Sequence, residues 1–277
     1  MKQLIQQIAS QLQAAYPADE AEALAWWIAE ETTGLSRTQL LCGCKGTKNI
    51  SNLQDIINRL LLFEPIQYIF GHTLWCGLDL RVTPATLIPR PETAELVERL
   101  SNFKSKISNL KSQIRVLDVG TGSGCIALAL KKQHPDWQVT GIDISAEAIQ
   151  VARENARRNK LDVEFLQMDI FSDSIDKNQY DIVVSNPPYI CEWEKAAMRD
   201  NVLRYEPAAA LFVPDDDPLR FYRRIASLHL APLIFFEFNE HFPAQMEALL
   251  REEGYTDIVL THDSYGKPRI IEGRMAE

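Results

Sequence analysis

RVLDVGTGSGCIALALKKQ, residues 115–133, reads as a buried strand, a glycine-rich turn and a helix in direct succession. The mostly apolar start predicts a strand over 115–119, and the pattern after the turn predicts a helix over 125–133. Glycines between the two permit a tight turn and let a ligand approach the backbone, with the helix N-terminus behind it. The stretch therefore predicts one βα unit with a ligand-binding turn.

Strands and helices alternate on both sides of this unit. A strand over 138–142 and a helix over 146–158 follow it, and Pro91 opens a helix over 92–100 before it, as proline does at a first helical position. This alternation predicts an α/β fold, a doubly wound sheet with helices on both faces. The remaining predicted elements are strands over 163–166, 180–185, 233–238, 257–260 and 269–271 and a helix over 243–252.

The start of the chain has a different pattern, because its apolar residues recur at helical spacing between short polar breaks. Residues 1–70 are therefore predicted to form an all-helical bundle without a catalytic cluster of its own. Residues 71–90 carry aromatic and β-branched residues followed by prolines, which predicts a short β-hairpin connector. The α/β domain then spans 91–277, with a solvated loop over 101–113.

The most informative stretch is Asn186-Pro187-Pro188-Tyr189, directly after the predicted strand 180–185. Two consecutive prolines cannot extend a sheet ladder, so the chain leaves the strand at Asn186 and forms a stiff loop at its carboxyl end. Ligands bind at that edge of open α/β sheets. The Asn186 side-chain oxygen and the Pro187 carbonyl are two acceptors beside an aromatic ring, an array that suits a planar NH2 group.

The glycine-rich turn alone leaves two kinds of cofactor open. Residues 122–127 also satisfy the looser dinucleotide pattern GxGxxA, and Asp143 lies 19 residues beyond Gly124, as a nicotinamide-dependent enzyme would require. Asp118 leads the turn, however, and a carboxylate suits a cationic ligand better than a pyrophosphate. S-adenosylmethionine, with its sulfonium and ammonium groups, meets that need. The candidate cofactor-binding residues of the turn are Asp118, Gly120, Thr121, Gly122, Ser123 and Gly124.

Acidic residues also follow the next two predicted strands. Asp143 ends the second strand, with Ile144 after it, and an acid there can accept both hydroxyls of a ribose. Asp169 follows the third strand, where it can face an adenine amino group while Ile170 or Phe171 covers the ring. These five residues are added to those of the turn as candidates for the cofactor site.

Composition and charge limit the class of protein. The 277 residues are 46% hydrophobic and carry a net charge of −9, which argues against a broad basic surface that grips nucleic acid. The five cysteines are odd in number and include a lone CxC at 42–44, so we expect no metal site and a reduced, cytoplasmic location. We also expect no signal peptide and no membrane span.

These stretches together resemble the class I S-adenosylmethionine-dependent methyltransferases, and within them the HemK/PrmC family. The resemblance covers nearly the whole chain, and residues 87–93 (LIPRPET) together with Asn186 to Tyr189 are its most specific part. It implies a mostly parallel, seven-stranded Rossmann-like methyltransferase sheet. It also implies that the chain uses S-adenosylmethionine to methylate the glutamine of the GGQ motif in peptide-chain release factors. We expect a monomer that contacts neither nucleic acid nor membrane.

The resemblance also implies roles for single residues. In the family, the asparagine and first proline carbonyl of this motif bind the substrate amide, which implies those roles for Asn186 and Pro187. Tyr189 is the third catalytic candidate, because it can pack against the amide. Arg90 and Glu92 are candidates to order the site or contact the partner, although a structural salt bridge is an equal alternative. The substrate-binding candidates are Asn186, Pro187, Pro188, Tyr189, Arg90 and Glu92, and Asn186 is also a cofactor-site candidate.

Two segments depart from the family pattern. Residues 212–217 (FVPDDD) stand where many members carry GGxDG, and residues 237–239 (EFN) stand where many carry EIG. Both leave the cofactor and amide residues intact, so they bear on local loop shape and on how the partner is seated.

Three other functions remain open on the residues alone. A nucleic-acid adenine-N6 methyltransferase presents the same NH2 geometry, but it should add a basic groove, and 29 Lys and Arg face 38 Asp and Glu here. A nicotinamide-dependent oxidoreductase fits the glycine turn. A binding module without activity would leave three ligand-facing strand ends without a purpose.

Overall fold

The computed structural model describes two compact units, each with its own apolar core. The first unit comprises residues 1–71 with 199–205, and the second comprises residues 72–198 with 206–277. The residues described within them are 2–44, 52–107, 113–172, 174–175 and 179–275. No helix among these residues combines the length and the apolar character needed to cross a bilayer.

The first unit is built from helices, as the apolar spacing predicts. Its core is formed by side chains that face inward from different helices, among them Ile8, Leu12, Ile28 and Ile57. A distant segment joins this unit, since the Tyr205 hydroxyl donates to the Leu62 carbonyl at 2.9 Å. The helices are α1 (Lys2–Leu12), α2 (Ala18–Thr33), α3 (Arg37–Leu41), α4 (Leu53–Leu61), α5 (Ile66–Phe70) and α9 (Asp200–Tyr205).

The predicted hairpin is present as β1 (His72–Trp75) and β2 (Leu78–Arg81), which pair antiparallel. It is fixed to the second unit by two asparagines of α8 (Ala146–Asn159), Asn155 and Asn159, whose amides exchange hydrogen bonds with the backbone of residues 79–81. Because the backbone groups of the hairpin edge are satisfied in this way, the hairpin is an ordered part of the second unit.

The second unit contains the predicted mostly parallel sheet of seven strands. The order across the sheet is β10-β11-β9-β6-β3-β4-β5, and β11 runs antiparallel to both of its neighbours. The strands are β3 (Arg115–Val119), β4 (Gln138–Asp143), β5 (Glu164–Gln167), β6 (Ile182–Ser185), β9 (Leu233–Glu237), β10 (Tyr255–His262) and β11 (Pro268–Met275).

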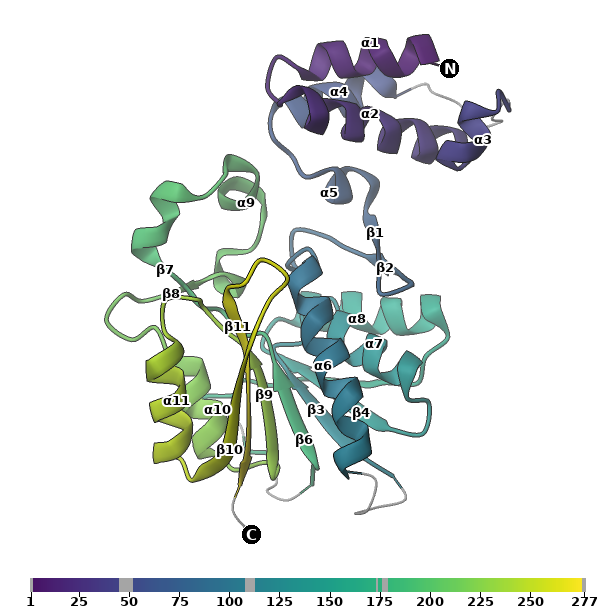
Figure 1. The fold of residues 1–277 in the computed structure, drawn as a ribbon. Helices are drawn as coiled ribbons and strands as arrows, with labels where there is room; N and C mark the ends of the chain where they lie inside the picture. Colours follow the sequence, from purple (N-terminus) through teal and green to yellow (C-terminus); the bar gives the residue numbers. More distant parts are fainter. Residues whose placement is uncertain (1, 45–51, 108–112, 173, 176–178, 276–277) are drawn as a thin grey trace. The chain divides into compact units, whose positions relative to one another are not determined.

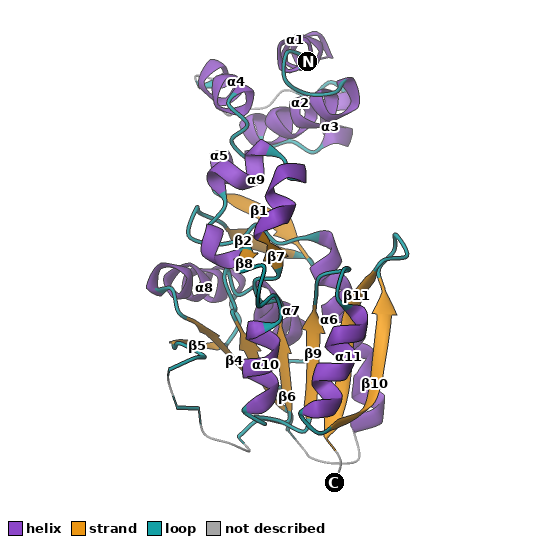
Figure 2. Cartoon of the chain, turned by 90° about the vertical axis from the view of Figure 1, so that its left-hand side faces the viewer, coloured by secondary structure: helices purple, strands orange, loops and turns teal. Residues whose placement is uncertain are grey.

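Helices cover both faces of this sheet (Figures 1 and 2). Adjacent strand residues point to opposite faces, so Val116 packs in one core and Leu117 in the other. The first core lies under α6 (Pro91–Ile107), α7 (Cys125–Gln133) and α8, and the second under α10 (Arg220–Ser227) and α11 (Pro243–Glu252). Burial on both faces explains why the parallel strands read as continuous apolar runs.

Two parts of the sequence-based prediction are wrong or incomplete. The loop expected over 101–113 is helical as far as Ile107, because α6 continues and Phe103 packs edge-on against Phe235 at 5.5 Å; residues 108–112 lie outside the described residues. The region after β6 contains elements that were not predicted. They are β7 (Ile190–Cys191), η1 (Glu192–Ala197), α9, η2 (Ala208–Ala210), β8 (Phe212–Val213) and α10.

Candidate active site

The glycine-rich turn and the Asn186 loop lie at neighbouring strand ends. β3 and β6 are paired in parallel, and the order of strands reverses between them, because β3 leads to β4 on one side and β6 leads to β9 on the other. Such a reversal opens a crevice at the carboxyl edge of a sheet. The Ser185 hydroxyl donates to the Val119 carbonyl at 2.6 Å, which fixes the two strand ends to each other.

The carboxyl group of Asp118 is hydrogen-bonded to the glycine turn and to the first turn of the helix after it. It is fully buried, and its Oδ2 accepts from the Thr121 hydroxyl at 2.6 Å and from the Ala127 amide at 3.2 Å. Its Oδ1 is buried without a hydrogen-bond partner among the described residues. Burial raises the pKa of Asp118 to about 7. A positive charge near the turn would favour the ionised carboxylate, so the site is suited to a cationic ligand.

The glycines of the turn divide into two kinds. Gly120 and Gly122 have positive φ angles of 71° and 56°, and a Cβ at either position would meet no described atom within 4 Å. Gly124 also has a positive φ, 80°, but a Cβ there would lie 2.9 Å from the Phe165 ring and 3.1 Å from the Ala152 methyl group. The first two glycines therefore leave open space above the turn, while Gly124 allows α7 to pack closely.

This difference predicts separate outcomes for two alanine variants. In both variants the alanine must adopt a left-handed backbone conformation, which costs about 1–2 kcal/mol. Gly124→Ala adds a steric clash, so it should lower the thermal unfolding midpoint more than Gly122→Ala. Gly122→Ala should mainly weaken the binding of the predicted cofactor, S-adenosylmethionine, which isothermal titration calorimetry would measure. Equal unfolding midpoints of the two variants, or an unchanged affinity of Gly122→Ala for S-adenosylmethionine, would contradict these different roles of the two glycines.

Asp143 holds the other side of the turn. Its Oδ2 accepts from the Gly122 amide and its Oδ1 from the Ser145 amide, both at 2.9 Å. Burial raises the pKa of this carboxyl above its usual range, although the backbone hydrogen bonds oppose that shift. The next residue, Ile144, is 63% exposed, which is unusual for an isoleucine. The pair presents an oriented carboxylate beside an exposed apolar side chain.

Residues 169–171, the third predicted part of the cofactor site, follow β5, which pairs in parallel with β4. Asp169 accepts from the Phe171 amide and the Ser172 hydroxyl, both at 2.9 Å, and so closes a turn. Ile170 is buried, whereas Phe171 is 38% exposed and packs edge-on against Phe221 at 5.2 Å. Of the two, Phe171 has the exposed side chain, and the Arg220 guanidinium carbon lies over its ring at 4.9 Å from the centroid.

The Asn186 loop is connected to two residues that sequence reasoning did not select. The Asn186 side-chain Nδ2 donates to the Thr93 hydroxyl oxygen at 3.0 Å, and the Thr93 hydroxyl donates to Glu237 Oε2 at 2.7 Å. The Tyr189 hydroxyl donates to Glu237 Oε1 at 3.0 Å. Thr93 lies in the first turn of α6 and Glu237 ends β9. The buried carboxylate of Glu237 therefore holds both ends of the Asn186 to Tyr189 segment, Tyr189 directly and Asn186 through Thr93.

Both departures from the family pattern contact the segment that follows this loop. The Asn239 amide donates to the Tyr189 carbonyl at 2.9 Å and to Glu194 Oε2 at 2.8 Å. Asp215 accepts from the Trp193 amide at 3.2 Å. A cavity of about 600 Å³ opens beside Tyr189, Trp193 and Asn239. Asn239 therefore lines a cavity next to the candidate substrate loop, and Asp215 is hydrogen-bonded to another lining residue, Trp193.

Comparison with known proteins matches both units of the chain. The PrmC N-terminal domain model matches residues 3–71, and the Methyltransferase small domain model matches residues 97–204. The release factor glutamine methyltransferase of Bacteroides thetaiotaomicron is 42% identical to this chain over an alignment of 284 residues. The alignment covers 98% of this chain and 99% of the relative. The chain belongs to the release factor glutamine methyltransferase family.

Further relatives support this membership, and solved structures share the fold. The release factor glutamine methyltransferase of Lactococcus lactis is 36% identical, covering 89% of this chain and 90% of the relative. The crystal structure of the hMettl16 catalytic domain in complex with MAT2A 3'UTR hairpin 1 has a TM-score of 0.58 at 16% identity, covering 98% of this chain and 92% of that one. The resemblance in sequence to the HemK/PrmC family is thereby confirmed.

The cofactor of the protein is S-adenosylmethionine, as predicted. The described residues fit that molecule. The open space above Gly120 and Gly122 leaves room for it, and the Asp118 Oδ1, which has no hydrogen-bond partner among the described residues, suits its cationic groups. The carboxylate of Asp143 suits a ribose, and the exposed side chain of Ile144 suits an adenine face.

Arg90 and Glu92, in the LIPRPET segment of this family member, differ in their surroundings. Arg90 forms an ion pair with the buried carboxylate of Glu206, which also accepts from the Ile88 amide at 3.1 Å. The Arg90 carbonyl accepts from the Trp75 indole at 2.9 Å. Glu92 lies in the first turn of α6, where an acid is favourable. Arg90 therefore joins the LIPRPET segment to Glu206 and to the hairpin.

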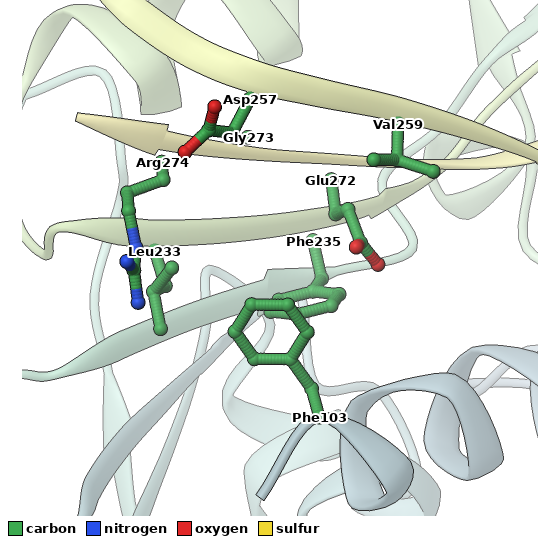
Figure 3. A pocket seen from close by; sticks show the side chains of 8 residues that line it. All are labelled: Phe103, Leu233, Phe235, Asp257, Val259, Glu272, Gly273 and Arg274. Atoms are coloured by element: carbon green, nitrogen blue, oxygen red, sulfur yellow. The ribbon is translucent and has the colours of Figure 1, made fainter. Parts of the chain in front are cut away.

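A second cavity of about 220 Å³ lies at the other end of the sheet (Figure 3). It is lined by Leu233, which begins β9, by Phe103, and by Glu272 in the middle of β11. Glu272 forms an ion pair with Arg99 at 2.7 Å. Because the cofactor turn and the Asn186 loop lie at the carboxyl edge, this cavity is separate from the candidate active site.

Proposed function

We propose that this protein transfers a methyl group from S-adenosylmethionine to the side-chain amide nitrogen (N5) of the glutamine in the GGQ motif of peptide-chain release factors. The observation that supports this proposal most is the orientation of Asn186. Its Nδ2 is engaged by Thr93 at 3.0 Å, so its oxygen points away from Thr93 and is oriented to accept from a substrate NH2 group.

The reaction requires positioning more than acid–base chemistry. When bound, S-adenosylmethionine supplies an electrophilic methyl group on its sulfonium. A carboxamide nitrogen is a poor nucleophile, so Asn186 and the Pro187 carbonyl would orient the NH2 group and stabilise positive charge as it develops there. Well-oriented reactants can gain on the order of 7–11 kcal/mol from such positioning. The stiff Pro187-Pro188 backbone and the anchored Tyr189 keep both acceptors fixed before the reaction.

One experiment tests the substrate class. The protein is incubated with methyl-labelled S-adenosylmethionine and a release factor, the same factor with its GGQ glutamine replaced by alanine, or DNA. We expect label on the unmodified factor alone. Label on DNA would favour the alternative, an adenine-N6 methyltransferase, and label on the alanine factor would place the methyl group on another residue.

We propose that residues 1–70 bind the release factor while the protein acts as a cytoplasmic monomer without direct nucleic-acid contact. The substrate is a loop on a large folded protein, and the first unit has an apolar core of its own and, among its described residues, no group of three or more His, Cys, Asp or Glu side chains that could hold a metal ion. On this proposal a short GGQ peptide should have a much higher KM than the whole factor, with a smaller change in kcat.

Amide hydrogen exchange locates the contact directly. We expect addition of the release factor to slow exchange at exposed positions within residues 2–44 and 52–71, and the short peptide to leave them unchanged. Protection confined to the second unit would contradict a role for the first.

A further inference from the structure

A chain of buried hydrogen bonds links Glu237, Thr93 and Asn186, and its donors can be counted. Thr93 and Glu237 are 2% and 1% exposed, so water does not compete for these groups. Thr93 has one hydroxyl proton, which it donates to Glu237 Oε2 at 2.7 Å. The Tyr189 hydroxyl proton goes to the other carboxylate oxygen at 3.0 Å. An ionised carboxylate can accept both, because it has no proton of its own to place.

The count fixes the direction of the next hydrogen bond. Once its proton is given to Glu237, the Thr93 oxygen offers only lone pairs to Asn186. The NH2 end of the Asn186 amide satisfies them at 3.0 Å. A reversed amide would place two acceptors against each other in a buried site, which is unfavourable because neither oxygen would then have a donor. The oxygen of Asn186 is therefore held on the side away from Thr93.

We propose that Thr93 and Glu237 are positioning residues that select the acceptor-outward orientation of the Asn186 amide. Its catalytic consequence rests on the proposed function, since only an NH2 substrate needs an acceptor at this position. Glu237 also anchors Tyr189, so one carboxylate sets the orientation of Asn186 and the place of the aromatic ring.

The ionisation of Glu237 gives this arrangement a pH dependence. Burial raises the pKa of Glu237, while the hydroxyl donors Thr93 and Tyr189 and the nearby Arg269 lower it and Glu92 raises it. Tyr222 contacts the same residue through the backbone carbonyl, to which its hydroxyl donates at 3.0 Å.

A protonated Glu237 holds a proton that must be donated, so its bond to Thr93 or to Tyr189 reverses or breaks. If the Thr93 bond reverses, Thr93 donates to Asn186 and the amide turns its oxygen inward. The rate at saturating cofactor should therefore fall as the pH drops through a pKa above the usual glutamate range.

Three variants test the proposal by methyl transfer to release factor. Thr93→Val keeps the shape but removes the hydroxyl, and Thr93→Ser restores it. We expect Thr93→Val to lower kcat about tenfold, the factor that corresponds to 1.4 kcal/mol, with an unchanged dissociation constant for S-adenosylmethionine. Thr93→Ser should recover most of that loss. Glu237→Gln should lower kcat and remove the fall of kcat at acidic pH, because glutamine does not titrate.

A measurement without turnover separates this proposal from the proposed function. In ¹⁵N-labelled protein, the side-chain amide resonance of Asn186 (assigned by its loss in Asn186→Ala) should shift in Thr93→Val and should titrate with Glu237 in the unmodified protein. The unmodified protein needs no substitution to be read, so a failure of Thr93→Val to fold leaves the test intact. A resonance that neither shifts nor titrates would overturn the proposed positioning role of Thr93 and Glu237. Inactivity of the unmodified protein on release factor would overturn the proposed function instead.

Discussion

Asn186→Ala should lower kcat for methylation of release factor by about 10²–10³-fold, the loss seen when one preorganised hydrogen-bond partner of a transition state is removed. The Asn186 oxygen is expected to accept from the substrate NH2, and this bond strengthens as the nitrogen becomes cationic. The dissociation constant for S-adenosylmethionine should change little, because the acids and glycines of the cofactor turn are untouched. Stopped assays at saturating cofactor and isothermal titration measure the two quantities.

A matched control is Asn159→Ala, which also removes a hydrogen-bonded asparagine amide; that amide donates to the backbone carbonyls of Asp79 and Asn155. Asn159 lies at the end of α8, where it holds the hairpin. It should cost stability without a comparable loss of kcat. If Asn186→Ala lost cofactor affinity but kept its turnover at saturating cofactor, the assignment of this loop to the substrate amide would be wrong.

The parts of the site that could be predicted are those whose chemistry is local in sequence. Asn186 and the two prolines after it follow a buried strand directly, so a stiff loop at the strand end is dictated by the backbone. The glycine turn is equally local, because its strand, its turn and its helix are consecutive. The parallel order then brings both loops to one edge of the sheet.

Thr93 and Glu237 were missed because their partners are far away in the sequence. Thr93 is 93 residues from Asn186 and 144 from Glu237. A threonine in the first turn of a helix and a glutamate after an apolar strand each have ordinary explanations when they are considered alone. The signal was present in the LIPRPET and EFN segments, but only the fold shows that both reach the same loop.

The extent of α6 and the elements after β6 were missed for a different reason. Residues 101–107 carry serines, lysines and an asparagine, which weaken the helical pattern, and the packing of Phe103 on Phe235 became apparent only with the sheet in place. Tertiary contacts override weak local preferences in this way. The short elements between β6 and α10 have few turns each, so periodicity gives little signal there.

Asp143→Ala should have the opposite effect to Asn186→Ala, weakening S-adenosylmethionine binding first. Both carboxylate oxygens already accept backbone amides at 2.9 Å, which aims their remaining lone pairs. Hydrogen bonds to charged groups contribute roughly 1.5–3 kcal/mol each, so the loss of ribose contacts should raise the dissociation constant about 10²-fold. At saturating cofactor, kcat should recover to a large part. Isothermal titration and cofactor-dependent rates measure both effects.

Asp143 also gives the binding a pH dependence with a defined sign. Burial raises the pKa of its carboxyl above the usual aspartate range. The ionised carboxylate accepts hydrogen bonds more strongly and on both oxygens, so cofactor affinity should be constant well above this pKa and should fall as the pH drops through it. Asp181→Ala is the matched control, because Asp181 is a buried carboxylate that accepts from the Arg115 amide at the opposite end of β3. If Asp181→Ala weakened cofactor binding as much as Asp143→Ala, the effect would reflect loss of folding and the ribose assignment would fail.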